Sequence, residues 1–172
     1  LLVKDFATEA LPFPGLSPRV LEDALREVKQ RKHLLDCLYA IVTSTLKGSH
    51  AYKECLRNNG SPDDSKVEQK PTHFPSASEL YNCGIHLKAS RETEAGNMSS
   101  IWYDAASTTL FIPKVRVGDD TERLFRNLIA YESHLIDKVS VVSYFRFMNG
   151  LVDTAEDVAL LVQRGILAQD IG

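Results

Sequence analysis

A long run of apolar residues at helical spacing constrains the fold more than any other feature of this 172-residue chain. It follows Ser17 and Pro18, which are typical of a helix N-cap and of the first helical position. Its members are Leu21, Leu25, Val28, Lys32, Leu35, Tyr39, Val42 and Leu46. Their steps of three and four residues predict one continuous amphipathic helix, about 40 Å long, that ends near Gly48.

The next part of the chain indicates a linker and then a brief capped helix. Residues 58–72 are polar and contain the turn-forming residues Asn, Gly, Ser, Pro and Asp, which is typical of a solvated linker. Ser76 and Glu79 have the S-x-x-E spacing of a capping box. Gly84 follows where a left-handed residue would end such a helix.

A small β region follows. Residues 101–103 and 108–112 are rich in β-branched and aromatic residues, and residues 104–107 separate them as a turn. This pattern predicts an antiparallel hairpin. Pro113 either ends the ladder of the second strand or restricts that strand to an edge, because proline has no backbone N–H to donate.

Three helices are expected after the hairpin. Asp119 is predicted to cap the first of them, and Thr154 the last. The middle helix, from Val141 to Val152, is apolar over more than one face and should lie at the centre of the core. We therefore expect an α+β fold that is predominantly helical, with one small antiparallel β-hairpin.

The predicted elements divide the chain into three parts of one domain. Residues 1–57 hold a lead-in and the long amphipathic helix, residues 58–72 the linker, and residues 73–172 the hairpin with the C-terminal helices.

The net charge of −3 and the 44% hydrophobic content indicate a soluble globular domain, and they exclude a disordered tail or an autonomous basic nucleic-acid binder. The chain begins with Leu1, so we expect a fragment of a longer protein.

The sequence carries no motif for nucleotide binding, metalloprotease or serine hydrolase activity, or calcium binding. The tightest carboxylate cluster is Asp153, Glu156 and Asp157, at the start of the last predicted helix. Negative charge there is stabilised by the helix dipole, so we interpret the cluster as structural. The alternative is an enzymatic site in which these acids hold a cation or exchange protons.

A zinc-dependent module is a second form of this alternative. His33 and Cys37 are four residues apart, and Cys83 and His86 flank Gly84. Imidazole and thiolate groups are typical zinc ligands, but neither pair has the spacing of a zinc knuckle. We therefore expect no catalytic, cofactor-binding or metal-binding residues in this chain.

Several segments resemble one known family. They are residues 33–36, 74–80 with 83–85, 110–113, 120–132 and 149–158. In this order they are similar to the plant domain-of-unknown-function-247 family of UPF0481-like proteins, over about residues 33–167.

This resemblance implies a non-catalytic plant recognition or signalling protein. It also suggests the grass self-incompatibility type, a pollen-side determinant that binds a small secreted stigma protein. Expected partners are that protein or another protein or peptide, and the family's N-terminal region, but no nucleic acid. The resemblance implies association of the full-length protein with the plasma membrane through a segment absent here, and we expect the present fragment to be soluble.

Exposed loops are the expected partner surface, because they can vary without unfolding the domain. The residues that we select from the linker and from the loop before the hairpin are Asn59, Ser61, Asp63, Asp64, Arg91, Glu92, Glu94 and Asn97.

Overall fold

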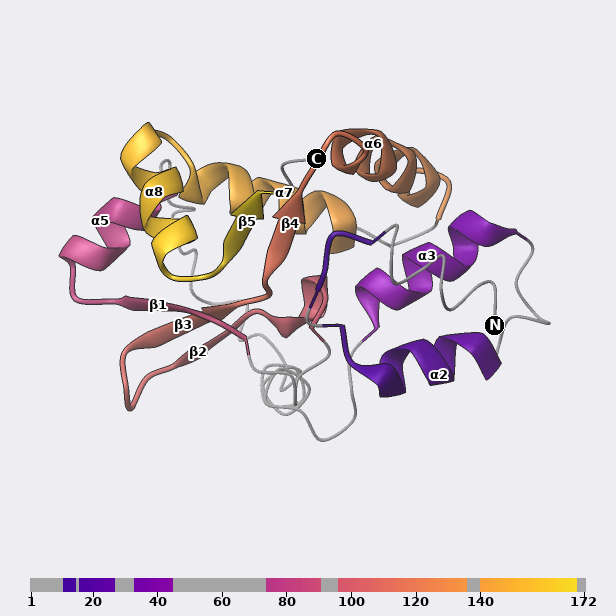
Figure 1. Cartoon of the computed structure of the whole chain (residues 1–172), viewed down its shortest axis with the longest axis horizontal. Helices are drawn as coiled ribbons and strands as arrows, with labels where there is room; N and C mark the ends of the chain where they lie inside the picture. Colours follow the sequence, from indigo (N-terminus) through magenta and orange to yellow (C-terminus); the bar gives the residue numbers. More distant parts are fainter. Residues whose placement is uncertain are drawn as a thin grey trace, which may run out of the picture.

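The computed structural model describes residues 11–14, 16–26, 33–44, 74–90, 96–135 and 140–169. In this part of the chain, helices pack with two small sheets (Figure 1). This arrangement confirms the predicted α+β class with a predominance of helix.

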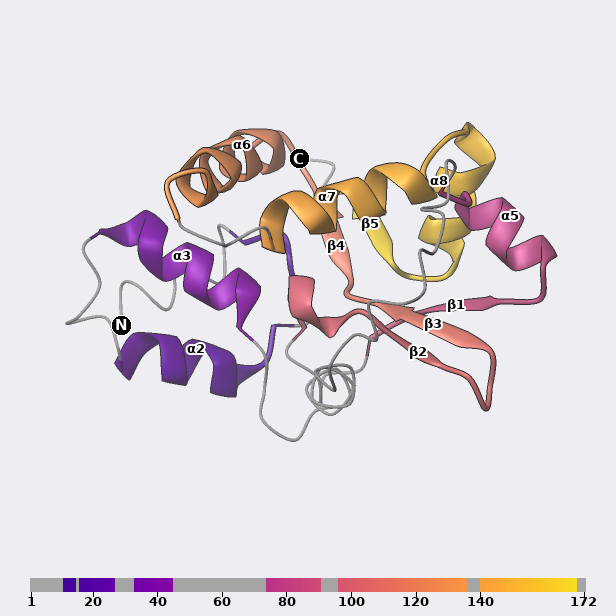
Figure 2. The same ribbon diagram turned by 180° about the vertical axis from the view of Figure 1, so that it is seen from behind.

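The N-terminal apolar stripe forms two helices, α2 (Pro18–Arg26) and α3 (Leu34–Thr43). Between them His33 has an extended backbone, with φ −161° and ψ 170°, and its Nδ1 accepts a 3.3 Å hydrogen bond from the backbone N–H of Asp36. The prediction of one continuous helix to Gly48 is therefore wrong. The break allows α2 and α3 to lie side by side (Figures 1 and 2), so that both apolar faces enter one core.

The first sheet has the strand order β1-β3-β2, with β1 at His86–Ala89, β2 at Trp102–Asp104 and β3 at Thr109–Ile112. β2 and β3 are antiparallel, which confirms the predicted hairpin, and the rings of Trp102 and Phe111 stack at 4.0 Å across it. β1 lies parallel to β3 on its other side. The hairpin is thus part of a larger mixed sheet.

A second sheet consists of two parallel strands, β4 (Val115–Val117) and β5 (Leu167–Gln169). The sequence pattern did not predict this pairing. β3 ends at Ile112, directly before Pro113. This end is expected, because proline has no backbone N–H to donate to a neighbouring strand. On the other side of β4, the backbone N–H of Arg116 donates a 2.7 Å hydrogen bond to the carbonyl of Pro12 and so attaches the lead-in.

The remaining helices pack with these sheets. They are α5 (Ala77–Asn82), the 3-10 helix η2 (Met98–Ser100), α6 (Thr121–Glu132), α7 (Ser140–Leu151) and α8 (Ala155–Gln163). The sheet of β1, β2 and β3 lies below α5, α7 and α8 in the view of Figure 1. Within the described ranges, no helix has both the length and the apolar character needed to cross a bilayer.

The helix ends test the predicted caps. The capping box of Ser76 and Glu79 and the N-cap role of Thr154 are confirmed. Asp119 is not the N-cap of α6, because Asp120 occupies that position, and the Asp120 side chain makes no capping hydrogen bond. At this helix start the N–H of Gly118 donates to the hydroxyl of Thr121, the first helical residue, at 2.9 Å, and the N–H of Thr121 donates to the carbonyl of Gly118 at 3.1 Å.

Gly84 ends α5 as predicted. Its φ is +85°, a left-handed conformation that strongly favours glycine. The N–H groups of Gly84 and Ile85 donate to the carbonyls of Tyr81 and Leu80, each at 3.0 Å, which is the Schellman pattern. The same closure recurs after α8 at Gly165, with φ +69°.

Two hydrophobic clusters form the core. The first contains Leu11, Phe13, Val20, Leu21, Leu38, Tyr39, Ile41, Val42, Met98, Val115, Phe125, Leu128, Val141 and Tyr144. The second contains Ala77, Leu87, Ile112, Leu151, Leu161 and Ile166. α7 contributes to both clusters, and its Met148 packs against each of them. Both views show α7 running from the side of α6 to the side of α8 (Figures 1 and 2), which confirms the predicted central place of α7.

Candidate functional site

A groove with a volume of about 650 Å³ opens between β4, α6 and α7. Its lining residues are Val115, Val117, Gly118, Asp119, Thr121, Glu122, Phe125, Arg126, Ile129, Tyr144, Phe145, Met148 and Leu167. This volume lies within the range of small-ligand pockets, and the lining has the usual mixture of many apolar and few polar groups.

Four aromatic side chains form a closed ring of edge contacts at the groove. The rings of Phe125 and Phe145 are 4.6 Å apart, and that of Phe145 lies 5.8 Å from Tyr144. Phe13 completes the ring at 6.1 Å from Tyr144 and 6.4 Å from Phe125. Such edge-to-face pairs add specific stabilisation to simple area burial. Three of the four rings, Phe125, Tyr144 and Phe145, line the groove.

Tyr144 is the unusual member of this aromatic ring. Its side chain is 5% exposed, and its hydroxyl has no hydrogen-bond partner among the described residues. Burial raises the pKa of this phenol, so the hydroxyl stays protonated and keeps a proton to donate. A buried hydroxyl without a partner is rare in folded proteins.

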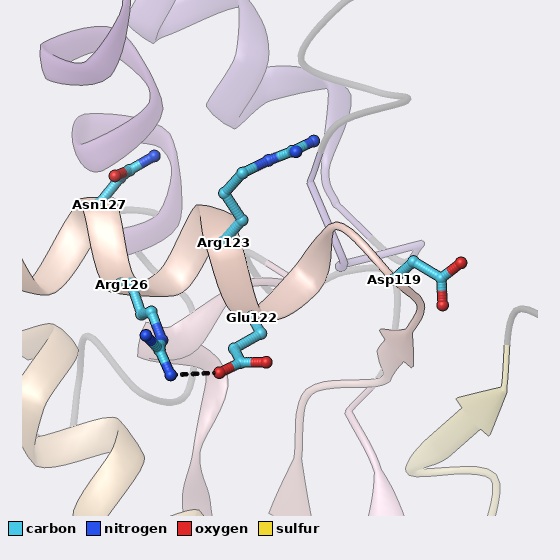
Figure 3. A pocket seen from close by; sticks show the side chains of 5 residues that line it. All are labelled: Asp119, Glu122, Arg123, Arg126 and Asn127. Atoms are coloured by element: carbon cyan, nitrogen blue, oxygen red, sulfur yellow. Dashed lines mark ion pairs between the residues drawn. The ribbon is translucent and has the colours of Figure 1, made fainter.

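The solvent-facing side of α6 borders the groove and carries charges of both signs. A second, smaller hollow of about 340 Å³ is lined by Asp119, Glu122, Arg123, Arg126 and Asn127 (Figure 3). Glu122 and Arg126 point to one side of the helix and form a 2.6 Å ion pair, whereas Arg123 and Asn127 point to the other. Exposed ion pairs of this kind contribute little to stability, so these charges are available to a partner.

Asp157 is the one member of the predicted carboxylate cluster that faces inward. It is fully buried, whereas Asp153 and Glu156 are exposed. Its Oδ1 accepts hydrogen bonds from the hydroxyl of Ser76 at 2.9 Å and from the N–H of Ser78 at 2.7 Å. Its Oδ2 accepts from the backbone N–H groups of residues 153 and 154 at 3.2 and 2.8 Å. One carboxylate thus serves the N-termini of both α5 and α8.

The environment of Asp157 keeps it ionised. Burial by itself would raise the pKa of the carboxyl, but the donated hydrogen bonds, first among them that from Ser78, outweigh burial and hold the pKa well below its usual range. A carboxylate in this state is a hydrogen-bond acceptor for helix N-termini. This arrangement matches the structural interpretation of the cluster.

Glu132 accepts hydrogen bonds at the N-terminus of α7, as Asp157 does at the N-termini of α5 and α8. The sequence pattern did not identify this role of Glu132. It is 2% exposed, and its Oε1 accepts hydrogen bonds from the Tyr39 hydroxyl at 2.8 Å and from the N–H of Val141 at 2.9 Å. Its Oε2 accepts from the N–H of Val142 at 2.9 Å. The single carboxylate therefore joins α3 and α6 to the N-terminus of α7, where the helix dipole favours negative charge.

The four residues of the zinc alternative do not come together. His33 and Cys37 belong to the N-terminal helices, where Cys37 is buried, whereas Cys83 and His86 are exposed at the junction of α5 and β1. α3 and α5 lie at opposite ends of the molecule in both views (Figures 1 and 2). In the part of the chain that the structure describes, no three His, Cys, Asp or Glu side chains are placed to hold a metal ion.

Most of the predicted partner residues lie outside the described part of the chain. These are Asn59, Ser61, Asp63, Asp64, Arg91, Glu92 and Glu94. Asn97 is described and is fully buried, and its Nδ2 donates to the carbonyls of Ile41 and Ser44. We correct the expectation for Asn97, because this amide holds η2 against α3 and is not available to a partner.

The groove itself was not predicted from the sequence. Its walls come from β4, α6 and α7, and Leu167 adds a contribution from β5. The sequence shows the helical spacing of Phe125, Ile129 and Phe145. This spacing predicts an apolar helix face, but it does not show whether another element covers that face. Only the tertiary arrangement leaves part of these faces open.

Comparison with known proteins identifies relatives of the chain. Residues 3–172 match the family DUF247, which is described as a plant protein of unknown function. A UPF0481 protein from Arabidopsis thaliana is 34% identical over 95 residues, which are 55% of this chain and 17% of that protein. The matched region is therefore a small part of the relative's length. No solved structure matches the chain significantly.

Proposed function

The chain belongs to the plant family DUF247, and on this premise we propose that it is a non-catalytic recognition or signalling protein. In this proposal its finer role is that of a pollen-side determinant of gametophytic self-incompatibility, which binds a small secreted stigma protein. The resemblance to the grass self-incompatibility type supports this role. Sequence outside residues 1–172 would hold the full-length protein at the plasma membrane.

The observation that carries the recognition role is the charged face of α6. The side chains of Glu122, Arg123 and Arg126 are 73–77% exposed. Glu122 and Arg126 border the groove, and Arg123 points to the other side of the helix (Figure 3). Charges of both signs on a helix attract a partner of complementary charge, and such complementarity raises the association rate.

The buried acids support the non-catalytic part of the proposal. Asp157 and Glu132 each use both carboxylate oxygens to accept hydrogen bonds from backbone N–H groups. A general acid or base instead needs a lone pair or proton within reach of a substrate. These two groups therefore have the surroundings of structural residues.

Isothermal titration calorimetry of the chain with a small secreted stigma protein of the same plant tests the proposal. Reversal of both α6 charges, Arg123→Glu with Arg126→Glu, should weaken binding about tenfold or more at low salt, because the attractive charges become repulsive. Arg26→Glu on α2 is the matched control, since Arg26 and Arg126 are 78% and 77% exposed, and it should leave the affinity unchanged. The proposal fails if the unmodified chain does not bind, or if the control weakens binding equally.

A further inference from the structure

We propose that Asn97 is an N-glycosylation acceptor only in the unfolded chain, and that a glycan on Asn97 and the contact of η2 with α3 exclude each other. This inference does not depend on the recognition role.

Asn97 begins a glycosylation motif. Asn97, Met98 and Ser99 have the pattern Asn-x-Ser, which marks an acceptor asparagine and is typical of an exposed loop in a secreted protein. The structure places this motif in the core instead, because Asn97 is fully buried and Met98 is 6% exposed. A second motif, Asn59-Gly60-Ser61, lies outside the described residues.

The two polar side chains of the motif bind the C-terminal end of α3. The Nδ2 group of Asn97 donates to the carbonyls of Ile41 and Ser44, the latter at 3.0 Å. The hydroxyl of Ser99 donates to the carbonyl of Thr43 at 2.8 Å. The last carbonyls of a helix have no partners within the helix, so the motif supplies the donors that α3 needs.

Glycosylation would remove one of these donors. Transfer of an oligosaccharide from its lipid pyrophosphate carrier forms a bond between the sugar C1 atom and Nδ2. The same step breaks the bond from C1 to the pyrophosphate oxygen and releases one amide proton. The remaining Nδ2 proton cannot serve both carbonyls, and an unmade buried hydrogen bond is costly.

The sugar would also need space where the fold leaves none. The Asn97 side chain is fully buried, and so is the neighbouring Ser100 of η2. A glycan on Nδ2 can therefore be accommodated only when η2 leaves α3. The native protein should carry Asn97 without a glycan, whichever compartment it folds in.

A single-subunit oligosaccharyltransferase with a lipid-linked oligosaccharide tests the accessibility of Asn97, and peptide mass spectrometry reads each motif separately. The matched control Ala105→Asn creates the motif Asn-Ala-Ser in the exposed turn between β2 and β3. We expect the enzyme to modify position 105 of this variant and Asn97 in a synthetic peptide of residues 94–102. Asn97 in the folded chain should react at least about a hundredfold more slowly than in the peptide, because its amide is reached only after unfolding.

Synthesis with an added signal peptide in the presence of microsomes tests the reverse effect, because the transferase then meets the chain before it folds. Molecules with a glycan on Asn97 should be cleaved by trypsin at least about tenfold faster than unmodified molecules, since η2 cannot pack on α3. Molecules of Ala105→Asn with a glycan at position 105 should resist trypsin as the unmodified chain does.

Four results would overturn the inference. In the transferase assay they are equal rates for Asn97 in the folded chain and in the peptide, or equal protection of position 105. A peptide that is not modified also overturns it, because the sequence and not burial would then protect Asn97. In the microsome assay the contrary result is unchanged trypsin resistance of molecules with a glycan on Asn97.

Discussion

Asp157 of α8 accepts a 2.9 Å hydrogen bond from the hydroxyl of Ser76, the N-cap residue of α5, which lies 81 residues earlier in the chain. The same carboxylate also closes the capping box of its own helix with Thr154. A helix N-terminus has backbone N–H groups without partners within the helix, and a carboxylate is a favourable acceptor for them. Asp157 therefore couples the folding of α5 to that of α8.

Asp157→Asn should lower the free energy of unfolding by about 3 kcal/mol, because a buried charged acceptor is replaced by an amide that presents a donor to other donors. Urea denaturation at neutral pH measures this change. Glu156→Gln is the matched control at the exposed neighbouring position, and it should change stability by no more than about 0.5 kcal/mol. Equal effects of the two substitutions would contradict the assigned role of Asp157.

The same residue predicts a pH dependence. The folded-state pKa of Asp157 lies below its ordinary value, so its contribution is complete above the unfolded-state pKa of about 4 and is lost as the pH falls from there toward the folded-state pKa. The chain should therefore lose stability below about pH 4, and Asp157→Asn should lose less over the same interval. Parallel acid-denaturation curves for the two proteins would contradict this prediction.

Tyr39 and Glu132 predict a second, independent coupling. Tyr39→Phe should lower the free energy of unfolding by about 2 kcal/mol, because it removes the hydroxyl that donates to a buried carboxylate at 2.8 Å. Tyr103→Phe on β2, where the side chain is 44% exposed, is the control and should have little effect. A double-mutant cycle with Glu132→Gln should give a coupling energy of about 1 kcal/mol or more, and a value near zero would contradict the assignment.

Local signals predicted the local structure well. The capping box at Ser76, the left-handed Gly84 and the N-cap Thr154 each depend on residues within one helical turn, so their spacing in the sequence determines the outcome. The same reasoning located the antiparallel hairpin of β2 and β3, because a short loop joins its strands.

The failures concern interactions between distant residues. The stripe from Leu21 to Leu46 has helical spacing throughout, but spacing cannot show that His33 interrupts it and that the two halves share one core. The β4–β5 pair joins segments about 50 residues apart, and Glu132 accepts a hydrogen bond from a tyrosine 93 residues away. Open surface, such as the groove, is likewise a property of the tertiary arrangement.

The loop residues selected from the sequence lead to a separate prediction about specificity. From the sequence pattern alone we expect residues 58–72 and 91–95, which lie outside the described residues, to determine partner choice between allelic forms, because polar, turn-forming sequence can vary without disturbing a core. Exchange of both segments between two alleles should exchange partner choice and leave the melting temperature within about 2 °C. Asn97 stays unchanged in this design because it is buried. Unchanged partner choice after the exchange would exclude loop-borne specificity.

The most direct test of the recognition role is the dissociation constant of the chain with two small secreted stigma proteins, one from the same self-incompatibility allele and one from a different allele. Calorimetry at a single salt concentration allows a direct comparison, because charge-based association depends on ionic strength. We predict that the protein of the same allele binds at least about tenfold more tightly, which is a difference of about 1.4 kcal/mol. Equal affinities, or no binding of either protein, would contradict the proposed function.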